Sequence, residues 1–316
     1  MMKKNDLSGH PRTRGARSLL NQESNWSGDY PIRFGSIPSF DGTPIFYCVE
    51  GQGKPLVFCY GVACSSLHWT YQIDYFRKNY QCIWFDYRGH RRTPIPEKLE
   101  SLSIDSCVKD LKCILDFLEV KESVILGHSM GVSVALEYAH RFPEAVKLLV
   151  LANGTARKPL ETLFGGNFLQ PAFGLLSKLQ KEKPELVEAG WKIQEKTKWI
   201  GKSLGALGFN LHLVNPTDII TYARQMAELP PIVLTHFMDD YQHFDATAWL
   251  HEIKAQTLIL SGEIDLITPP RTQDLIHQLM PDSELRRVQH GSHCCTLDLP
   301  EYVNLLIERF LLQNHY

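Results

Sequence analysis

Short apolar runs alternate with amphipathic stretches through most of the chain. The apolar runs are typical of buried strands, and they cover residues 55–60, 81–87, 123–126, 147–152, 257–260 and 284–288. Apolar residues three or four positions apart predict helices over 103–118, 132–142, 270–279 and 301–312. Strands that alternate with helices predict an α/β fold, in which a mostly parallel sheet is covered by helices on both faces.

Two regions depart from this alternation. Residues 30–51 contain two strand-like runs around Asp41-Gly42, a dipeptide that favours a β-hairpin. Residues 155–244 show no clear strand pattern and predict an all-helical insertion. We therefore expect a helical cap over 155–244 and an α/β core over 29–154 and 245–316.

The N-terminal 28 residues are polar and contain Pro and Gly, so we expect a loose arm over 1–28. They have no apolar run that would suit a signal peptide. Three arginines leave a transit peptide open, but Glu23 and the helix breakers disfavour one. No later stretch reaches ~18 unbroken apolar residues, so the sequence predicts no membrane span. The default expectation is a cytoplasmic protein.

The composition is that of a globular protein without a strong field of one sign. The 316 residues are 44% hydrophobic and 22% charged, and 33 basic against 35 acidic residues give a net charge of −2. That balance offers no large positive surface for nucleic acid. The eight cysteines lie mostly in apolar runs without a C-x-x-C pair, so we expect free buried thiols and no structural zinc site.

The pattern G-x-S-x-G occurs twice, and the surrounding sequence distinguishes the two copies. Gly127–Gly131 follows a strand-like run and precedes a helix pattern, which places Ser129 on the strand-to-helix turn that a nucleophilic serine requires. Ser203 in Gly201–Gly205 follows a polar run inside the helical insertion, and we interpret it as a loop serine. Ser129 is therefore the expected nucleophile.

A nucleophilic serine needs a base in contact and a carboxylate that orients the base. Asp265 follows the apolar run at 257–260, where its side chain reaches the carboxyl edge of a parallel sheet, and it is the preferred acid. The competing interpretation of Asp265 is a helix cap. Glu263 is the nearest competitor, whereas Asp239 and Asp240 lie in the insertion and are predicted to be surface charges.

The base is expected downstream of the acid. His293 follows the last strand-like run and is preferred over His290, which we interpret as a packed or solvated loop histidine. Together with Cys294 and Cys295 these histidines resemble a metal cluster. Four ligands spaced so tightly in one loop rarely reach tetrahedral geometry, so we expect no metal here.

Taken in order, these elements make the chain resemble the α/β-hydrolase superfamily, in its branch of small esterases, lactonases, C–C hydrolases and haloperoxidase-like enzymes. The resemblance runs from about residue 31 to the end. It rests on Tyr60-Gly61 with Ser65 and Trp69, Asp86 with Arg88-Gly89, the turn at Ser129, Gly262 with Asp265 and Pro269, and Gly291 with His293, Asp298 and Pro300. It implies an eight-stranded, mostly parallel sheet with a helical cap inserted after the sixth strand.

The resemblance also implies an oxyanion hole built from two backbone N–H groups, those of Met130 and Val62. The family has a His-Gly dipeptide where this chain has Tyr60-Gly61. The geometry of this loop is therefore in question, and Tyr60 is a candidate for lining the substrate pocket. His128, beside the nucleophile, is a second candidate for contact with substrate.

A further family signature is Asp86-Tyr87-Arg88-Gly89, for which the resemblance implies a structural ion pair and a turn near the nucleophile. It continues into His90-Arg91-Arg92, where the family has smaller residues. These cationic side chains are candidates for binding an anionic substrate, but the favoured interpretation of the stretch is a solvated loop.

The primary hypothesis is a serine hydrolase that cleaves a carboxylic ester or related acyl compound through an acyl-enzyme. It requires no metal or organic cofactor, and its expected partner is a small molecule with an apolar acyl or aromatic group. Lactonases and C–C hydrolases use the same triad, so both stay open, as do a ligand-binding pseudo-hydrolase and a hydroxynitrile-type lyase. Dehalogenases and epoxide hydrolases of this fold use Asp as the nucleophile, and Ser129 argues against both.

Overall fold

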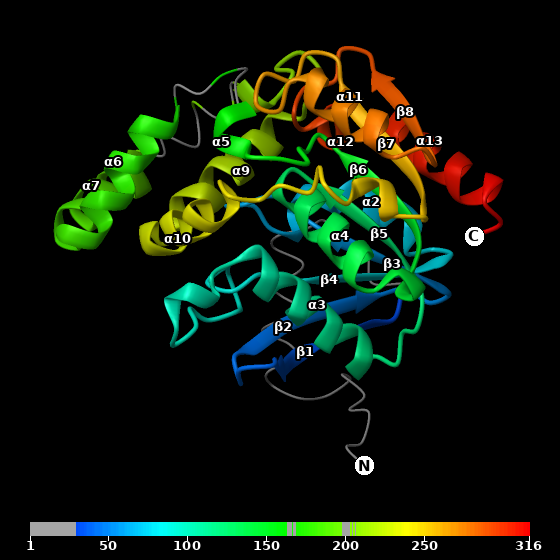
Figure 1. Ribbon diagram of the computed structural model, residues 1–316, viewed down its shortest axis with the longest axis horizontal. Helices are drawn as coiled ribbons and strands as arrows, with labels where there is room; N and C mark the ends of the chain where they lie inside the picture. The colour runs from blue at the N-terminus through cyan, green and yellow to red at the C-terminus, as the bar shows by residue number, and fades with distance from the viewer. Residues whose placement is uncertain (1–29, 163–165, 167–168, 198–202, 204, 206) are drawn as a thin grey trace.

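The computed structural model describes residues 30–162, 166, 169–197, 203, 205 and 207–316. The expected N-terminal arm lies outside them. An eight-stranded sheet has the order β1-β2-β4-β3-β5-β6-β7-β8, and only β2 runs antiparallel to its neighbours (Figure 1). The strands are β1 (Ile32–Pro38), β2 (Pro44–Glu50), β3 (Lys54–Cys59), β4 (Tyr80–Phe85), β5 (Ser123–His128), β6 (Val146–Ala152), β7 (Gln256–Gly262) and β8 (Ser283–Val288). The predicted fold class is confirmed.

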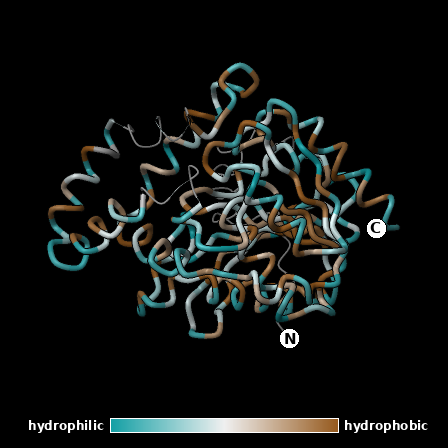
Figure 2. Tube along the Cα trace, turned by 45° about the horizontal axis from the view of Figure 1, so that its top comes forward, coloured by the Kyte–Doolittle hydropathy of each residue, from teal (hydrophilic) through white to brown (hydrophobic). Residues whose placement is uncertain are grey.

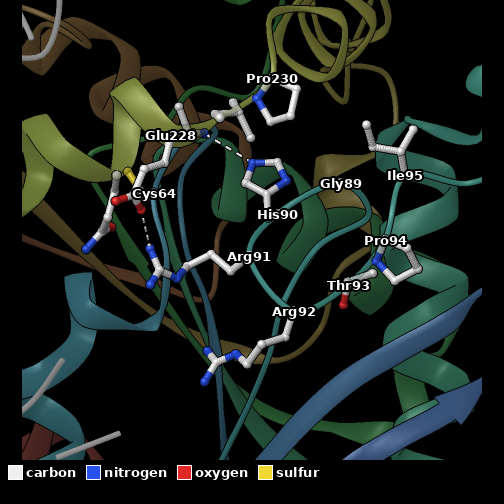
Figure 3. A pocket seen from close by; sticks show the side chains of 13 residues that line it. Cys64, Gly89, His90, Arg91, Arg92, Thr93, Pro94, Ile95, Glu228 and Pro230 are labelled. Atoms are coloured by element: carbon white, nitrogen blue, oxygen red, sulfur yellow. Dashed lines mark hydrogen bonds and ion pairs between the residues drawn. The ribbon is translucent and has the colours of Figure 1, made fainter. Parts of the chain in front are cut away.

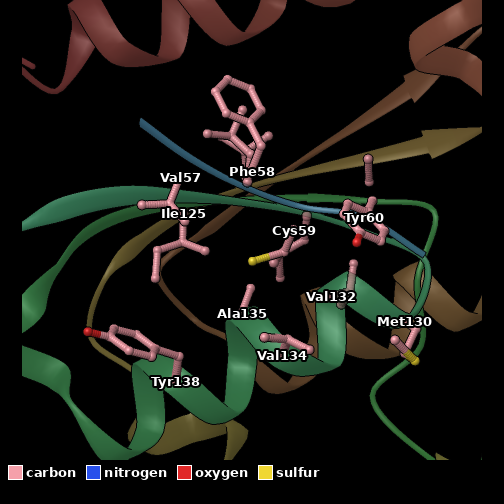
Figure 4. Packing of buried hydrophobic residues seen from close by; sticks show 14 of the residues in the cluster. Val57, Phe58, Cys59, Tyr60, Ile125, Met130, Val132, Val134, Ala135 and Tyr138 are labelled. Atoms are coloured by element: carbon pink, nitrogen blue, oxygen red, sulfur yellow. The ribbon is translucent and has the colours of Figure 1, made fainter. Parts of the chain in front are cut away.

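Helices cover both faces of this sheet. The helices of the core are α2 (Thr70–Phe76), α3 (Ile104–Phe117), α4 (Met130–Arg141), α11 (Pro270–Leu279), α12 (Cys295–Asp298) and α13 (Pro300–Gln313). Helix α4 packs on β5 and α3, while α2 packs on β4 and α13. In Figure 4, Cys59 projects toward Val132 and Ala135 of α4, and Phe58 projects from the opposite face of β3. There the Phe58 ring lies 5.6 Å from that of Trp69, next to α2.

The burial of each strand follows its place in the sheet. All six residues of β5 are buried, because helices cover both of its faces and strands flank both of its edges. The outer strand β8 is mostly half-buried. Figure 2 shows the result as a centre of hydrophobic strands inside more polar helices and loops. Burial of these apolar side chains is the main force that holds the sheet together.

Helix α4 begins two residues earlier than its apolar pattern predicts. Its first residue is Met130 rather than Val132, because Ser129 alone makes the turn from strand to helix. Ser129 has φ 54° and ψ −121°, values far from those of a helix. The side chain of the nucleophile candidate therefore stands directly at the N-terminus of a helix.

The helical cap lies between β6 and β7. The part of the cap that the structure describes includes the helices α5 (Pro159–Thr162), α6 (Leu169–Glu182), α7 (Pro184–Thr197), α9 (Pro216–Glu228) and α10 (Pro231–Tyr241). Figure 1 shows α6 and α7 at the outer side of the cap, away from the sheet. The chain enters and leaves the cap through adjacent segments, where Lys158 N–H donates to the Phe244 carbonyl at 2.6 Å and Ala246 N–H donates to the Ala156 carbonyl at 2.8 Å.

The prediction that Asp239 and Asp240 are surface charges is wrong for Asp240, while the partly exposed Asp239 pairs with the exposed Lys181 at 3.0 Å. Asp240 is half-buried, and its Oδ2 accepts a hydrogen bond of 2.8 Å from the N–H of Ile104 at the start of α3. Asp239 accepts a bond of 2.7 Å from the Ser177 hydroxyl of α6. Both carboxylates therefore hold the cap together or fasten it to the core. A sequence pattern does not reveal such contacts because they join distant segments.

The state of the cysteines and the lack of a predicted membrane span can be compared with the structure. The eight cysteines are free, and all except the half-buried Cys113 are buried, as predicted. Among the residues that the structure describes, no helix combines the length and apolarity needed to cross a membrane.

Candidate active site

Ser129 stands on a strained turn that two small residues make possible. Its φ is positive, which is uncommon for a residue with a side chain. A Cβ on Gly127 would lie 2.5 Å from the Gly131 carbonyl oxygen, and a Cβ on Gly131 would lie 2.3 Å from the Cys59 carbonyl oxygen. Ser129 is partly exposed, although the residues on either side of it are buried. The turn thus presents one hydroxyl at the carboxyl edge of the sheet.

Asp265 and His293 meet at the same edge. Asp265 Oδ2 lies 3.0 Å from His293 Nδ1, and both side chains are buried. Asp265 Oδ1 accepts bonds of 2.8 Å from the N–H groups of Ile267 and Thr268. These bonds fix the carboxylate. Because it accepts from Nδ1, the Nε2 atom of His293 is left as the basic nitrogen of the neutral ring.

Residues that the motifs did not single out hold this pair in place. The Thr268 hydroxyl lies 2.8 Å from Asp265 Oδ2 and 3.2 Å from His293 Nδ1. Asn153 Nδ2 donates to the His293 carbonyl at 2.7 Å, and Asn153 Oδ1 accepts from Gly262 N–H at 2.7 Å. Asn153 thus joins the loops after β7 and β8. Asn153 directly follows β6, and this position after a parallel strand is the feature of the sequence from which it could have been predicted.

The competing acid and base point elsewhere. Glu263 is exposed, and its Oε2 accepts a bond of 2.9 Å from the backbone N–H of His290. The His290 side chain is itself exposed. Ser203 is exposed, and its backbone is helical rather than in the predicted loop. Gly201 and Lys202 of the second motif lie outside the described residues. None of these three side chains joins Asp265 and His293.

The loop after β3 lies directly against Ser129. A Cβ on Gly61 would lie 2.9 Å from Ser129 Cβ and 3.3 Å from its Oγ, so only glycine fits. The two candidate oxyanion donors are the next residues in the chain, since Val62 follows Gly61 and Met130 follows Ser129 as the first residue of α4. The helix N-terminus adds partial positive charge at this point.

His90 supports the next residue of this loop, Ala63. The Ala63 N–H donates to His90 Nε2 at 3.3 Å, and His90 Nδ1 lies 3.0 Å from the Arg88 carbonyl oxygen. A carbonyl only accepts, so Nδ1 carries the proton and Nε2 is the acceptor. Burial lowers the pKa of His90 from 6.5 to about 4, which keeps this arrangement neutral.

Tyr60 does not line a pocket, contrary to the expectation from the sequence. It is fully buried, and its hydroxyl accepts a bond of 2.9 Å from Tyr87 N–H. The Tyr87 hydroxyl donates in return to the Tyr60 carbonyl at 3.0 Å. The two rings lie 4.4 Å apart. Tyr60 therefore anchors the loop that carries Gly61 and Val62, and its buried side chain is not available to contact substrate.

The cationic stretch His90-Arg91-Arg92 after β4 is solvated only in part, because His90 is buried and Arg92 is half-buried, while Arg91 is exposed. Arg88 is fully buried, and it pairs with Asp110 at 2.7 Å rather than with the Asp86 of its own signature. Asp86 pairs with Arg92 at 2.6 Å, and the Arg92 guanidinium lies 4.2 Å from the centre of the Phe46 ring. Arg88 also pairs with Asp41 at 2.5 Å. Three ion pairs therefore replace the single one that the resemblance implies.

His128 lies in a group of buried side chains beside the catalytic candidates. Its ring stacks on His68 with centroids 3.6 Å apart and planes 20° apart, and its Nε2 donates to the His293 carbonyl at 2.9 Å. Burial lowers the pKa of His68 to about 3 and that of His128 well below the usual value. Both rings thus stay uncharged near His293. His128 is fully buried, so the structure gives it a supporting contact rather than a surface for substrate.

Cys294 completes a trio of possible metal ligands with these two histidines, whose ligand atoms lie within 4.8 Å of one another. The stacking argues against an ion between them. Imidazole nitrogens bind metals in the plane of the ring, at ~2.0 Å. Two nearly parallel planes 3.6 Å apart cannot both contain the same ion. The residues therefore do not fit a metal centre.

A pocket of about 480 Å³ lies between the core and the cap. Its walls come from the loop after β3, the loop after β4 and the end of α9, and they include Ala63, Cys64, Pro94, Ile95, Leu229 and Pro230. Figure 3 shows His90 at its centre, below Pro230, with Arg91 reaching aside to Glu228. That ion pair measures 3.1 Å. Ala63, which lines the pocket, directly follows Val62 in the sequence.

Comparison with known proteins gives one family match and several relatives. Residues 54–298 match the model of the α/β hydrolase fold family. RutD of Azorhizobium caulinodans, a proposed carbamate hydrolase, is 23% identical over 269 residues, which are 84% of this chain and 94% of that protein. Protein ABHD8 of Homo sapiens is 26% identical over 259 residues, 81% of this chain. The matched region spans about half of ABHD8, 55% of its length.

Among solved structures, the esterase EaEST from Exiguobacterium antarcticum is similar with a TM-score of 0.75 at 20% identity. The match covers 88% of this chain and 99% of the esterase. At that identity the likeness shows the fold.

Proposed function

Because the chain belongs to the α/β-hydrolase family, we propose that it is a serine hydrolase that cleaves carboxylic esters through a covalent acyl-enzyme. One observation carries the proposal. Ser129 stands on the strained turn between β5 and α4, and a buried Asp265–His293 pair, 3.0 Å apart, lies at the same edge of the sheet. A serine, a base and an orienting acid in this arrangement are what acyl transfer requires.

In the proposed reaction, Ser129 Oγ attacks the ester carbonyl and His293 Nε2 takes its proton. Asp265 keeps the Nδ1 proton in place and stabilises the ring when it becomes charged. The N–H groups of Val62 and Met130 stabilise the oxyanion, and each such donor contributes about 3–4 kcal/mol in comparable enzymes. His293 then returns the proton to the leaving alcohol, and water hydrolyses the acyl-enzyme by the same steps.

The pocket between core and cap supports a substrate with an apolar acyl or aromatic group. Its apolar lining comes from side chains that include Pro94, Ile95, Leu229 and Pro230, and its polar lining comes from side chains that include His90, Arg91, Arg92 and Glu228. Its volume of about 480 Å³ falls in the range of small-molecule sites. Ser129, Asp265 and His293 do not line this pocket, but Ala63 of its wall directly follows the candidate oxyanion donor Val62 in the sequence. The proposal therefore assigns this space to the part of the substrate that is remote from the reacting carbonyl.

Carbamate cleavage is the second candidate function. It is favoured by the likeness to RutD, which covers most of both chains. The same nucleophile, base and oxyanion donors act on a carbamate carbonyl, so the choice between the two depends on what fills the pocket.

The test uses p-nitrophenyl esters from acetate to palmitate, a p-nitrophenyl carbamate and an enol-lactone, with wild type and Ser129→Ala side by side. We expect hydrolysis of a medium or short ester that Ser129→Ala abolishes, and the preferred chain length measures the pocket. Equal activity of the two proteins, or turnover that depends on Ser203 instead, would contradict the proposal. Preference for the carbamate would select the second candidate.

A further inference from the structure

A short segment of the cap is hydrogen-bonded to the loop that carries His293. We call residues 208–210 the clamp segment and residues 290–298 the histidine loop. The Gly208 carbonyl accepts bonds from Cys294 N–H at 2.9 Å and from the Ser292 hydroxyl at 2.7 Å. Asn210 Nδ2 donates to the His290 carbonyl at 2.9 Å. These contacts lie on both sides of His293 in the sequence.

A buried carboxylate connects the same two segments. Asp298 Oδ1 accepts from the Asn210 N–H at 3.0 Å, and Asp298 Oδ2 accepts from the Ser292 N–H at 2.8 Å. Asp298 is almost fully buried, so these bonds are shielded from water. Since a buried acceptor that loses its hydrogen-bond partner is destabilising, the clamp segment and the histidine loop are expected to move together.

The clamp segment also reaches the loop that carries Asp265. A Cβ on Gly208 would lie 3.3 Å from Ile267 Cδ1, so the backbone of the cap packs close to the acid loop. On the core side, the His293 carbonyl is held by Asn153 and His128. The histidine loop is therefore fixed by the core on one side and by the cap on the other.

We propose that the clamp segment is a positioning element of the triad, and that Asn210 is the cap residue that holds the His293 ring in reach of Asp265 and Ser129. This inference rests on the proposed function. It gives the cap a role in catalysis beyond enclosing the substrate. Asn210 acts through the loop and touches neither the reacting atoms nor the pocket wall.

The experiment compares Asn210→Asp and Asn210→Ala with wild type in the full chain. Asn210→Asp keeps an oxygen for the His212 N–H, 3.1 Å away in wild type, but it replaces the donor to His290 with a second oxygen. The matched control is Asn215→Ala, which removes the side-chain cap of α9 in the same domain, a bond of 3.0 Å to Thr217 N–H. Melting temperatures establish that each variant is folded.

The first readout is the rate at which a fluorophosphonate labels Ser129, because it requires no knowledge of the substrate. We expect both Asn210 variants to react about tenfold more slowly than wild type, since small displacements of catalytic groups cost one to two orders of magnitude. Asn215→Ala should stay within about twofold. In ester assays the same variants should lose kcat with little change in KM.

The second readout is the downfield proton resonance of a histidine Nδ1–H bound to a carboxylate. It should be present in wild type and Asn215→Ala and be lost or broadened in the Asn210 variants. If wild type is labelled at Ser129 while the Asn210 variants match it in rate and resonance, the inference is overturned and the proposed function stands. If wild type is not labelled at all, the proposed function fails, and the resonance alone decides the positioning role.

If Asn210→Asp does not fold, Ser292→Ala replaces it, because that variant removes the hydroxyl bond to Gly208 from the other side. A wild-type labelling rate in folded Ser292→Ala and Asn210→Ala would equally overturn the inference.

Discussion

Replacing His90 with Gln should change how the stability of the fold depends on pH. His90 is 1% exposed, and burial lowers its pKa to about 4 from 6.5. Between these values the unfolded chain binds a proton at this residue and the folded chain does not. The stability that the neutral ring contributes is therefore complete above pH 6.5 and is lost as the pH falls toward 4.

The size of the effect follows from the same two values. Each pH unit in this interval costs wild type about 1.4 kcal/mol at this residue. Between pH 7.5 and pH 5.0 the cost reaches about 2 kcal/mol, because protonation of the unfolded chain starts only near pH 6.5. His90→Gln has no ring to titrate and does not bear this cost. It should be less stable than wild type at pH 7.5, and the difference should shrink by about 2 kcal/mol at pH 5.0.

Urea unfolding of both proteins at the two pH values measures this difference, and other titrating groups cancel in the comparison. Buried carboxylates such as Glu50, whose pKa burial raises to about 7, act in both proteins alike. His251→Gln, which removes an exposed imidazole, is the matched control and should show the same difference from wild type at both pH values. A stability difference for His90→Gln that does not change with pH would refute the reasoning.

Three further outcomes are expected. Asp265→Asn should lower kcat about 10⁴-fold, because an amide that donates to His293 Nδ1 stabilises the wrong tautomer, and steady-state ester hydrolysis measures this. Glu263→Gln makes the same chemical change on an exposed carboxylate and should keep kcat/KM within about twofold in that assay; a larger loss would move the acid to Glu263. Gly131→Ala should lower the free energy of unfolding, measured in urea, by about 1–3 kcal/mol, because its Cβ would lie 2.3 Å from the backbone oxygen of Cys59. Its control is Gly174→Ala in helix α6, where a Cβ meets nothing within 4 Å, and this variant should raise the free energy of unfolding by about 0.5–1 kcal/mol.

The architecture could be read from the sequence because it rests on local patterns. Apolar runs and helical spacing predicted the strands of the core and four of its helices, but not the short helices α2 and α12. The break in that pattern at residues 155–244 marked the region where the helical insertion is found. The start of α4 was missed by two residues because Met130 and Gly131 follow the geometry of the Ser129 turn rather than a hydrophobic period.

The candidate site was partly readable for the same reason. Asp265 and His293 each follow a strand of a parallel sheet, and parallel strands end at one edge, where the two side chains lie 3.0 Å apart. Their catalytic roles stay a prediction.

The supporting residues were not readable from local pattern. Thr268, Asn153 and His90 form hydrogen bonds with segments far away in the chain. Tyr60 was expected in the pocket because the sequence does not reveal that its hydroxyl accepts a hydrogen bond from Tyr87 N–H. The favoured interpretation of the basic stretch after β4 was only partly right for a similar reason. Asp110 and Asp41, the partners of Arg88, lie in other segments, and the signature itself does not reveal that its Asp86 pairs with Arg92 rather than with Arg88.

The way in which the cap is attached has a consequence for how this protein can be re-engineered. Its entry and exit are paired by two backbone hydrogen bonds, between residues 156–158 and 244–246. A tight turn could therefore join the two ends with little loop-closure entropy, and the α/β core would keep its own connections. The α/β core thus accepts the cap as an insertion at these two points, and caps from other hydrolases could replace it there. Such a graft would also have to replace the contacts between cap and core, among them the donor to the His290 carbonyl, the donor to Asp298, and the acceptor for Cys294 N–H and the Ser292 hydroxyl.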